Sequence, residues 1–178
     1  MTLPQRLSFV ILGARNMTVL REFYAALGWS ERPGSDDNFA AYDAESDVLA
    51  LYPIERLGAE AAPSEPLPEP GWNGVTLGIN VENADAVDEA FTVAQAAGAH
   101  SIASPVRREW GGYSTYVVDP EGNRWEIAWA STSRDAHGPF APADGVLVGA
   151  PQAFYARLEL HDGPVEAQPE VCSCRRSD

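Results

Sequence analysis

The chain has 178 residues, 45% of them hydrophobic, and a formal net charge of −14 at pH 7 from 12 basic and 26 acidic residues. This charge opposes association with DNA, RNA and anionic membranes, because binding to phosphate depends on Lys and Arg. No apolar run reaches the ~20 residues of a membrane helix, and the N-terminal residues lack the pattern of a signal peptide. We therefore expect a cytoplasmic protein with neither a nucleic-acid nor a membrane partner.

The first elements in the chain are a strand, a helix and three short strands. Arg6–Ala14 (RLSFVILGA) is an apolar run typical of a buried strand. Asn16 can cap the helix that follows, and Gly28 can end it. The apolar face of this helix has the spacing i, i+3, i+4, i+7 and comprises Leu20, Phe23, Tyr24 and Leu27. Short strands are then expected at Trp29–Arg32, at NFAAYDA and at VLALYP.

The same order of elements returns after a segment with linker composition, GAEAAPSEPLPEPG, which has four prolines and no periodicity. GVTLGINV predicts a strand, and Asn83 can cap a second helix. The apolar face of that helix comprises Val87, Ala90, Phe91 and Ala94. Strands are expected at HSIASPVRR, YSTYVV and RWEIAWA. Asn16, Phe23 and Gly28 recur as Asn83, Phe91 and Gly98, at a spacing of 67 to 70 residues. The chain is therefore interpreted as two copies of one unit.

These patterns predict four segments. Residues 1–57 form the first βαβββ module, 58–73 the Pro/Glu-rich linker, 74–130 the second βαβββ module, and 131–178 a partly flexible C-terminal extension. Cys172 and Cys174, in the last of these segments, are interpreted as part of a polar chain end rather than as a disulfide framework.

Two motifs resemble a known family. VILGARNMTVLREFYAALGW in the first unit and WGGYSTYVVDPEGNRWEIA in the second are similar to the glyoxalase, bleomycin-resistance and extradiol-dioxygenase (vicinal oxygen chelate) superfamily, over roughly Leu7 to Ala130. The resemblance implies an α+β fold in which the two modules form a cupped, barrel-like mixed sheet with helices on its outer face. Function does not follow from this fold alone, because its members differ in chemistry.

In metal-using members of the family, four ligand positions face a cleft and hold His, Glu or Gln. The resemblance places Phe9 and Thr76 at two of these positions and Leu49 or Ala50 at the third. Only Glu126 keeps a ligand residue type. Because a catalytic divalent ion usually takes three protein ligands, we expect no metal site and no cofactor.

Strand alternation gives an orientation for Glu126. Trp125, Ile127 and Trp129 share one face of the last strand, which belongs under a helix, and Glu126 lies on the other face. Three interpretations of Glu126 stay open: a metal ligand, a carboxylate that contacts a small-molecule ligand or acts as a base, and a structural residue on the solvated side of a half-buried strand or in an ion pair with an Arg.

Other candidate ligand-binding residues are Phe9, Thr76, Asn80, Trp110 and Tyr113. Trp110 and Tyr113 flank two glycines, which suits a close approach at a cleft rim. Tyr116 is expected in the core or on the convex face. Residues 119–123, DPEGN, are interpreted as turn chemistry with no catalytic role.

The sequence thus predicts metal-independent binding or sequestration of a small organic molecule, with Glu126 as the main polar or catalytic group. The alternative is a metal-dependent lyase, isomerase or dioxygenase of the glyoxalase type. Whether the protein is an enzyme stays open, and a homodimer is a possible assembly.

Overall fold

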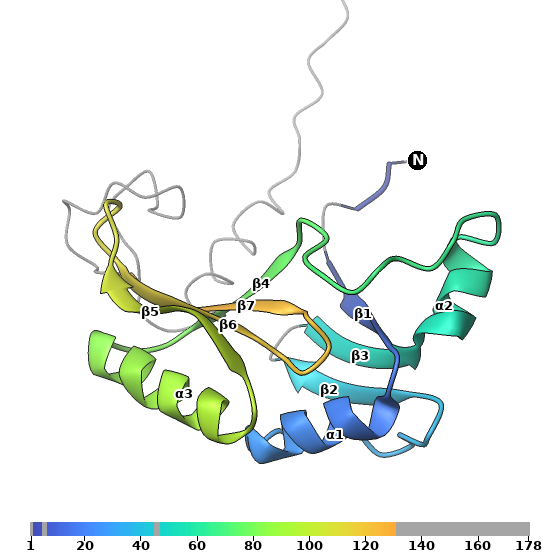
Figure 1. Ribbon diagram of the computed structural model, residues 1–178, viewed down its shortest axis with the longest axis horizontal. Helices are drawn as coiled ribbons and strands as arrows, with labels where there is room; N and C mark the ends of the chain where they lie inside the picture. Colours follow the sequence, from blue (N-terminus) through green and yellow to red (C-terminus); the bar gives the residue numbers. More distant parts are fainter. Residues whose placement is uncertain (1, 5–6, 45–46, 131–178) are drawn as a thin grey trace, which may run out of the picture.

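The computed structural model describes residues 2–4, 7–44 and 47–130 (Figure 1). The helices are α1 (Met17–Ala26), α2 (Ile54–Ala61) and α3 (Ala84–Ala96). The strands are β1 (Phe9–Ala14), β2 (Ala40–Ala44), β3 (Asp47–Pro53), β4 (Thr76–Asn80), β5 (His100–Arg107), β6 (Tyr113–Val118) and β7 (Arg124–Trp129).

The strands form two mixed sheets. In the first sheet the order is β1-β3-β2, with β1 parallel and β2 antiparallel to β3. The second sheet has the order β4-β7-β6-β5, in which β4 is parallel to β7 and the other pairs are antiparallel. Each sheet thus places the first strand of a module beside the last, as expected for repeated units. The α+β prediction is confirmed, although the two sheets do not close into a barrel.

Both long helices begin at the predicted caps. The side chain of Asn16 accepts a hydrogen bond from the backbone N–H of Val19, and that of Asn83 accepts one from Ala86. These bonds satisfy N–H groups that have no partner inside a helix. Helices α1 and α3 lie on the same side of the two sheets (Figure 1), so none of the helices in the described residues lies on the opposite side of the second sheet.

One core joins the two modules. Tyr24 of α1 is fully buried, and its ring lies 6.1 Å from that of Trp125 in β7 and 5.5 Å from that of Tyr42 in β2. Trp29 lies 5.7 Å from Trp125, again between ring centroids. Aromatic pairs at these separations are favourable beyond their area of burial. The modules are therefore held together by the contacts that Tyr24 of α1 and Trp29 make with Trp125 of β7.

Two elements differ from the sequence prediction. The strand expected at Trp29–Arg32 is reduced to an isolated bridge between Glu31 and Tyr42. The next residues explain this, because Pro33 cannot donate to a ladder and Gly34 turns the chain with φ 94°. Helix α2 was not predicted, and its last residues fall within the segment interpreted as linker. It packs on β1, where a Cβ atom added at Gly13 would lie 3.0 Å from Ile54.

Candidate functional site

Glu126 lies on the face of the second sheet that is not covered by any helix of residues 2–4, 7–44 and 47–130. Its strand neighbours Trp125 and Ile127 are only 7% and 5% exposed, and both belong to the core cluster that includes Ala94 of α3. Successive side chains on a strand point to opposite faces. Glu126, which is half-buried, therefore faces away from α3, as the alternation predicts.

The strand register shows which residues share this face with Glu126. Glu126 is paired with Gly78 of β4 and with Tyr116 of β6. Pairs two residues away on each strand extend the same face. We call this surface the helix-free face; its residues are Thr76, Gly78, Asn80, Ser114, Tyr116, Val118, Arg124, Glu126 and Ala128.

Tyr116 is the neighbour that changes the chemistry around Glu126. Burial, and then the hydrogen bond to Glu126 and the charge of its carboxylate, raise the pKa of Tyr116 above its ordinary value, whereas Arg108 lowers it. The hydroxyl of Tyr116 thus stays protonated beside the carboxylate. A carboxylate that accepts such a bond on one side keeps further lone pairs for another donor.

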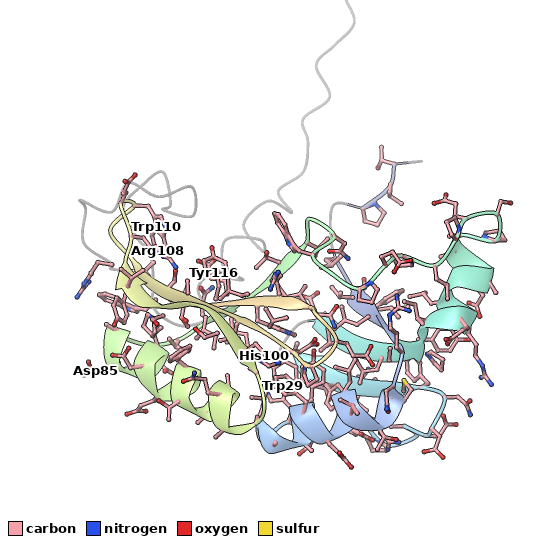
Figure 2. All side chains as sticks on the ribbon, in the orientation of Figure 1. Trp29, Asp85, His100, Arg108, Trp110 and Tyr116 are labelled. Atoms are coloured by element: carbon pink, nitrogen blue, oxygen red, sulfur yellow. The ribbon has the colours of Figure 1, made fainter. Side chains whose placement is uncertain are left out.

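Arg108 is fixed over Tyr116 at the end of β5. Its guanidinium carbon lies 5.2 Å from the centroid of the Tyr116 ring, and its Nε donates to the Oγ of Ser114 at 2.9 Å. Ser114 is fully buried. Because both contacts hold Arg108 in place, its guanidinium stays over the Tyr116 ring, next to the pair formed by Tyr116 and Glu126. Figure 2 shows Arg108 and Tyr116 on this part of the sheet.

The other side of Glu126 is uncovered among the described residues. A Cβ atom added at Gly78 would meet no atom within 4 Å. Thr76 and Asn80, two positions to either side of Gly78 on β4, are both exposed. The sequence-predicted residues Thr76, Asn80 and Glu126 are therefore brought together on one face, with free space above Gly78 in their midst.

Phe9 and the residues at the remaining family ligand position lie in the other sheet. Phe9 is 57% exposed on the edge strand β1, and it points away from the core that Val10 and Leu12 contact. Leu49 and Ala50 are buried in β3. The structure places these residues in a different sheet from Glu126.

The side chains at these four positions do not fit a catalytic divalent metal ion. Phe9, Leu49 and Ala50 offer no donor atom, and Thr76 offers only a neutral hydroxyl. In residues 2–4, 7–44 and 47–130, no group of three His, Cys, Asp or Glu side chains could hold a metal ion. Three ligands of suitable type are the usual minimum for a catalytic zinc site, and Glu126 alone does not meet it.

Trp110 and Tyr113, the two aromatic residues expected at a cleft rim, separate in the structure. Trp110 lies at the tip of the β5–β6 hairpin (Figure 2), and its ring covers Gly112, where an added Cβ would come within 1.7 Å of it. Tyr113 is paired with Trp129, and its hydroxyl donates to Asp88 of α3 at 3.0 Å. Tyr113 and Glu126 therefore lie on opposite faces of the sheet.

The DPEGN turn fastens the second module to α1. Asp119 is buried, accepts a hydrogen bond from the hydroxyl of Tyr24 at 3.0 Å and accepts others from the backbone N–H groups of Glu121 and Asn123. The carboxylate of Glu121 accepts from the backbone N–H groups of Arg15, at 2.7 Å, and Asn16, just before α1. The turn therefore also holds the second module against the start of α1 and Tyr24 in the first.

Sequence reasoning missed three residues of the helix-free face and its surroundings: Arg108, Ser114 and Tyr116. For Tyr116, expected in the core or on the convex face, a signal was present. The DPEGN turn brings Val118 opposite Arg124, and counting two residues away from the turn along each strand brings Tyr116 opposite Glu126. Arg108 had no such signal, because its position depends on the irregular register between β5 and β6.

Some predictions fall outside the described residues. They concern the extension 131–178, with Cys172 and Cys174. Among the described residues, none of the helices has the length and apolar character needed to cross a membrane.

Several solved structures are similar to this chain. A glyoxalase-related enzyme from Fulvimarina pelagi is 24% identical, with a TM-score of 0.66 over 82% of this chain and 98% of that one. A glyoxalase/bleomycin resistance protein/dioxygenase family enzyme from Burkholderia phytofirmans PsJN is 26% identical, with a TM-score of 0.60 over 70% and 98%. Lactoylglutathione lyase from Agrobacterium tumefaciens is 22% identical, with a TM-score of 0.55 over 72% and 96%.

No curated protein matches the chain. The family model described as the Glyoxalase/Bleomycin resistance protein/Dioxygenase superfamily matches residues 6–127. Because this match spans more than half of the chain, and the strand and helix order agrees with it, the chain belongs to the Glyoxalase/Bleomycin resistance protein/Dioxygenase superfamily.

Proposed function

We propose that this protein binds or sequesters a small organic molecule on the helix-free face, without a metal ion, and that Glu126 is its main polar contact. The observation that carries the proposal is the position of Glu126 beside Gly78, whose backbone no other described residue covers. A half-buried carboxylate next to open space can accept a hydrogen bond from a ligand while Tyr116 holds its orientation.

The surrounding residues supply the remaining contacts. Thr76 and Asn80 are exposed on either side of Gly78 and offer a hydroxyl and an amide. Phe9 and Trp110 provide apolar surface, on β1 and at the tip of the β5–β6 hairpin respectively. Tyr113 supports the site from the other face by tying β6 to α3 through Asp88.

Metal independence is part of the proposal because the donor set at the family ligand positions is incomplete. The alternative function is that of a metal-dependent lyase, isomerase or dioxygenase of the glyoxalase type. If the protein is an enzyme, Glu126 is the residue placed to act as a base. A cytoplasmic location fits the acidic composition, and a homodimer would cover the exposed apolar residues of β1.

The test uses Gly78→Val to fill the space beside Glu126. A branched side chain suits a strand and meets no atom here, so the variant should unfold at the same temperature as the wild type or slightly above it. The probes are benzylamine, benzoate and 4-(aminomethyl)benzoate, and binding is followed by ligand-observed NMR and by calorimetry. We expect saturable binding of at least one probe to the wild type and its loss in Gly78→Val.

The matched control is Ser101→Val, which adds the same side chain at an exposed position of β5, the far edge of the same sheet. This variant should bind as the wild type does. Undiminished binding in Gly78→Val, or no saturable binding of any probe to the wild type, would contradict the proposal.

A further inference from the structure

Arg124 is the charged residue of the helix-free face that the proposed function leaves unused. It begins β7, two residues before Glu126 and on the same face. In the part of the chain that the structure describes, Arg124 makes neither an ion pair nor a side-chain hydrogen bond. A half-buried guanidinium without a partner favours an anion placed next to it.

Arg108 does not compete for this role. Its Nε and Nη2 both donate to Ser114, and its guanidinium lies over the ring of Tyr116. The donors of Arg108 are thus partly used inside the protein. Arg124 has all five of its donors available to a ligand among the described residues.

The spacing of Arg124 and Glu126 selects the shape of the ligand. Two residues on a strand are separated by about 6.8 Å along it. The two side chains do not meet in an ion pair, although their charges are opposite. Thr76 is paired with Arg124, and Gly78 with Glu126, so the free space above Gly78 lies next to both charges.

We infer that the ligand is a small amphoteric molecule, whose anionic group contacts Arg124 and whose ammonium, N–H or O–H group contacts Glu126. A carboxylate suits Arg124, because the planar guanidinium can bind it through two parallel hydrogen bonds. The two groups are joined by a short apolar spacer that covers Gly78. This inference rests on the proposed function and names the chemical class of its ligand.

The test compares four probes that share one benzene ring. 4-(Aminomethyl)benzoate carries its two charged groups at opposite ends of the ring, phenylglycine carries both on one carbon atom, and benzylamine and benzoate carry one each. Calorimetry with the full chain should give the tightest binding for 4-(aminomethyl)benzoate. We expect each of the other three to bind at least about tenfold more weakly, since each loses one charge-assisted contact.

Substitutions assign each charge to its residue. Arg124→Gln should weaken the binding of 4-(aminomethyl)benzoate and benzoate by about tenfold and leave the binding of benzylamine unchanged, because it removes the anion contact alone. Glu126→Gln should weaken the binding of 4-(aminomethyl)benzoate and benzylamine by about tenfold and leave that of benzoate unchanged, because it removes the cation contact alone. Arg124→Lys keeps the charge but not the fork of donors, so its affinity for 4-(aminomethyl)benzoate should fall between those of the wild type and Arg124→Gln. A thermal melt of each variant establishes that it is folded.

The outcomes separate this inference from the proposed function. If a probe binds the wild type, is lost in Gly78→Val and is bound equally well by Arg124→Gln, the small-molecule function stands and the amphoteric ligand is wrong. Equal binding of phenylglycine and 4-(aminomethyl)benzoate would also overturn it. Both proposals are supported if Gly78→Val and Arg124→Gln each lose binding of 4-(aminomethyl)benzoate and Arg124→Gln still binds benzylamine as the wild type does.

Discussion

Tyr24 shows how single residues in this protein combine structural and electrostatic roles. Its hydroxyl donates to buried Asp119 and links α1 to the DPEGN turn. Burial, followed by the charge of Asp119, raises the pKa of Tyr24 well above its ordinary range. Burial also raises the pKa of Tyr42 to about 12. Both tyrosines are therefore held in the neutral form by the folded state.

The first prediction is a loss of stability at high pH. Because the folded pKa of each tyrosine lies above the unfolded value of about 10, the folded state binds more protons between the two values. The stabilisation is complete below pH 10 and is lost as the pH rises towards the folded pKa. Each group can lower the free energy of unfolding by up to about 1.4 kcal/mol per pH unit in that interval. Urea unfolding between pH 8 and 11.5 measures it.

Tyr24→Phe should reduce this slope above pH 10. At pH 7 the same change should lower the free energy of unfolding by about 1–3 kcal/mol, because Asp119 loses a buried donor. Tyr52→Phe is the comparison: the hydrogen bond to Glu60 also raises the pKa of Tyr52, but Tyr52 is only half-buried in β3, so this change should reduce the slope less than Tyr24→Phe does. An unchanged pH slope in Tyr24→Phe would show that Tyr24 does not carry the effect.

At the scale of elements, the β6–β7 hairpin positions both the candidate site and the start of α1. One strand supplies Tyr116, the other supplies Arg124 and Glu126, and the turn between them holds Asp119 and Glu121. A change in the register of this hairpin by one residue would move Glu126 to the face under α3. The buried contacts of the turn therefore also fix the orientation of the site.

The second prediction concerns the carboxylate of Glu121. Glu121→Ala removes the acceptor for the backbone N–H groups of Arg15 and Asn16 and should lower the free energy of unfolding by about 1 kcal/mol. Chemical denaturation at pH 7 measures the change. Glu109→Ala, in the exposed turn between β5 and β6, is the matched control and should change stability by less than about 0.5 kcal/mol. Equal effects of the two changes would contradict the contact.

The sequence of helix α2 contains an apolar pattern that is typical of a helix. Ile54, Leu57, Gly58 and Ala61 have the spacing of an apolar helix face. This pattern is short, and the prolines and glutamates that follow it favour a linker, so the sequence analysis predicted no helix here. Its packing against Gly13 of β1 stabilises a helix that is too short to be stable by itself.

At the scale of the whole molecule, the two modules share one core. The third prediction is that residues 1–66 do not fold alone, because Tyr24 and Trp29 would lose their contacts with Trp125. Circular dichroism of this fragment should show no cooperative thermal transition. A sigmoidal melt with a folded baseline would show that the first module is autonomous.

The fourth prediction concerns metal content. If the incomplete donor set excludes a bound ion, the purified protein should contain no stoichiometric transition metal, and a chelator should leave its melting temperature unchanged. Elemental analysis that finds about one nickel, zinc, iron or manganese per chain, lost in Glu126→Gln, would favour the glyoxalase-type enzyme instead.

The sequence by itself determined the order of strand, helix and strands in each half, both capped helices and the side of β7 on which Glu126 lies, because these depend on local spacing and strand alternation. The tertiary structure decided what surrounds Glu126. Tyr116, Gly78 and Arg108 come from three other segments, and their positions depend on strand pairing across the sheet. Contacts between distant residues likewise decided two other features: the single bridge that replaces the strand expected at Trp29–Arg32, and the packing of α2 on β1. A periodic pattern in the sequence carries no information about such contacts.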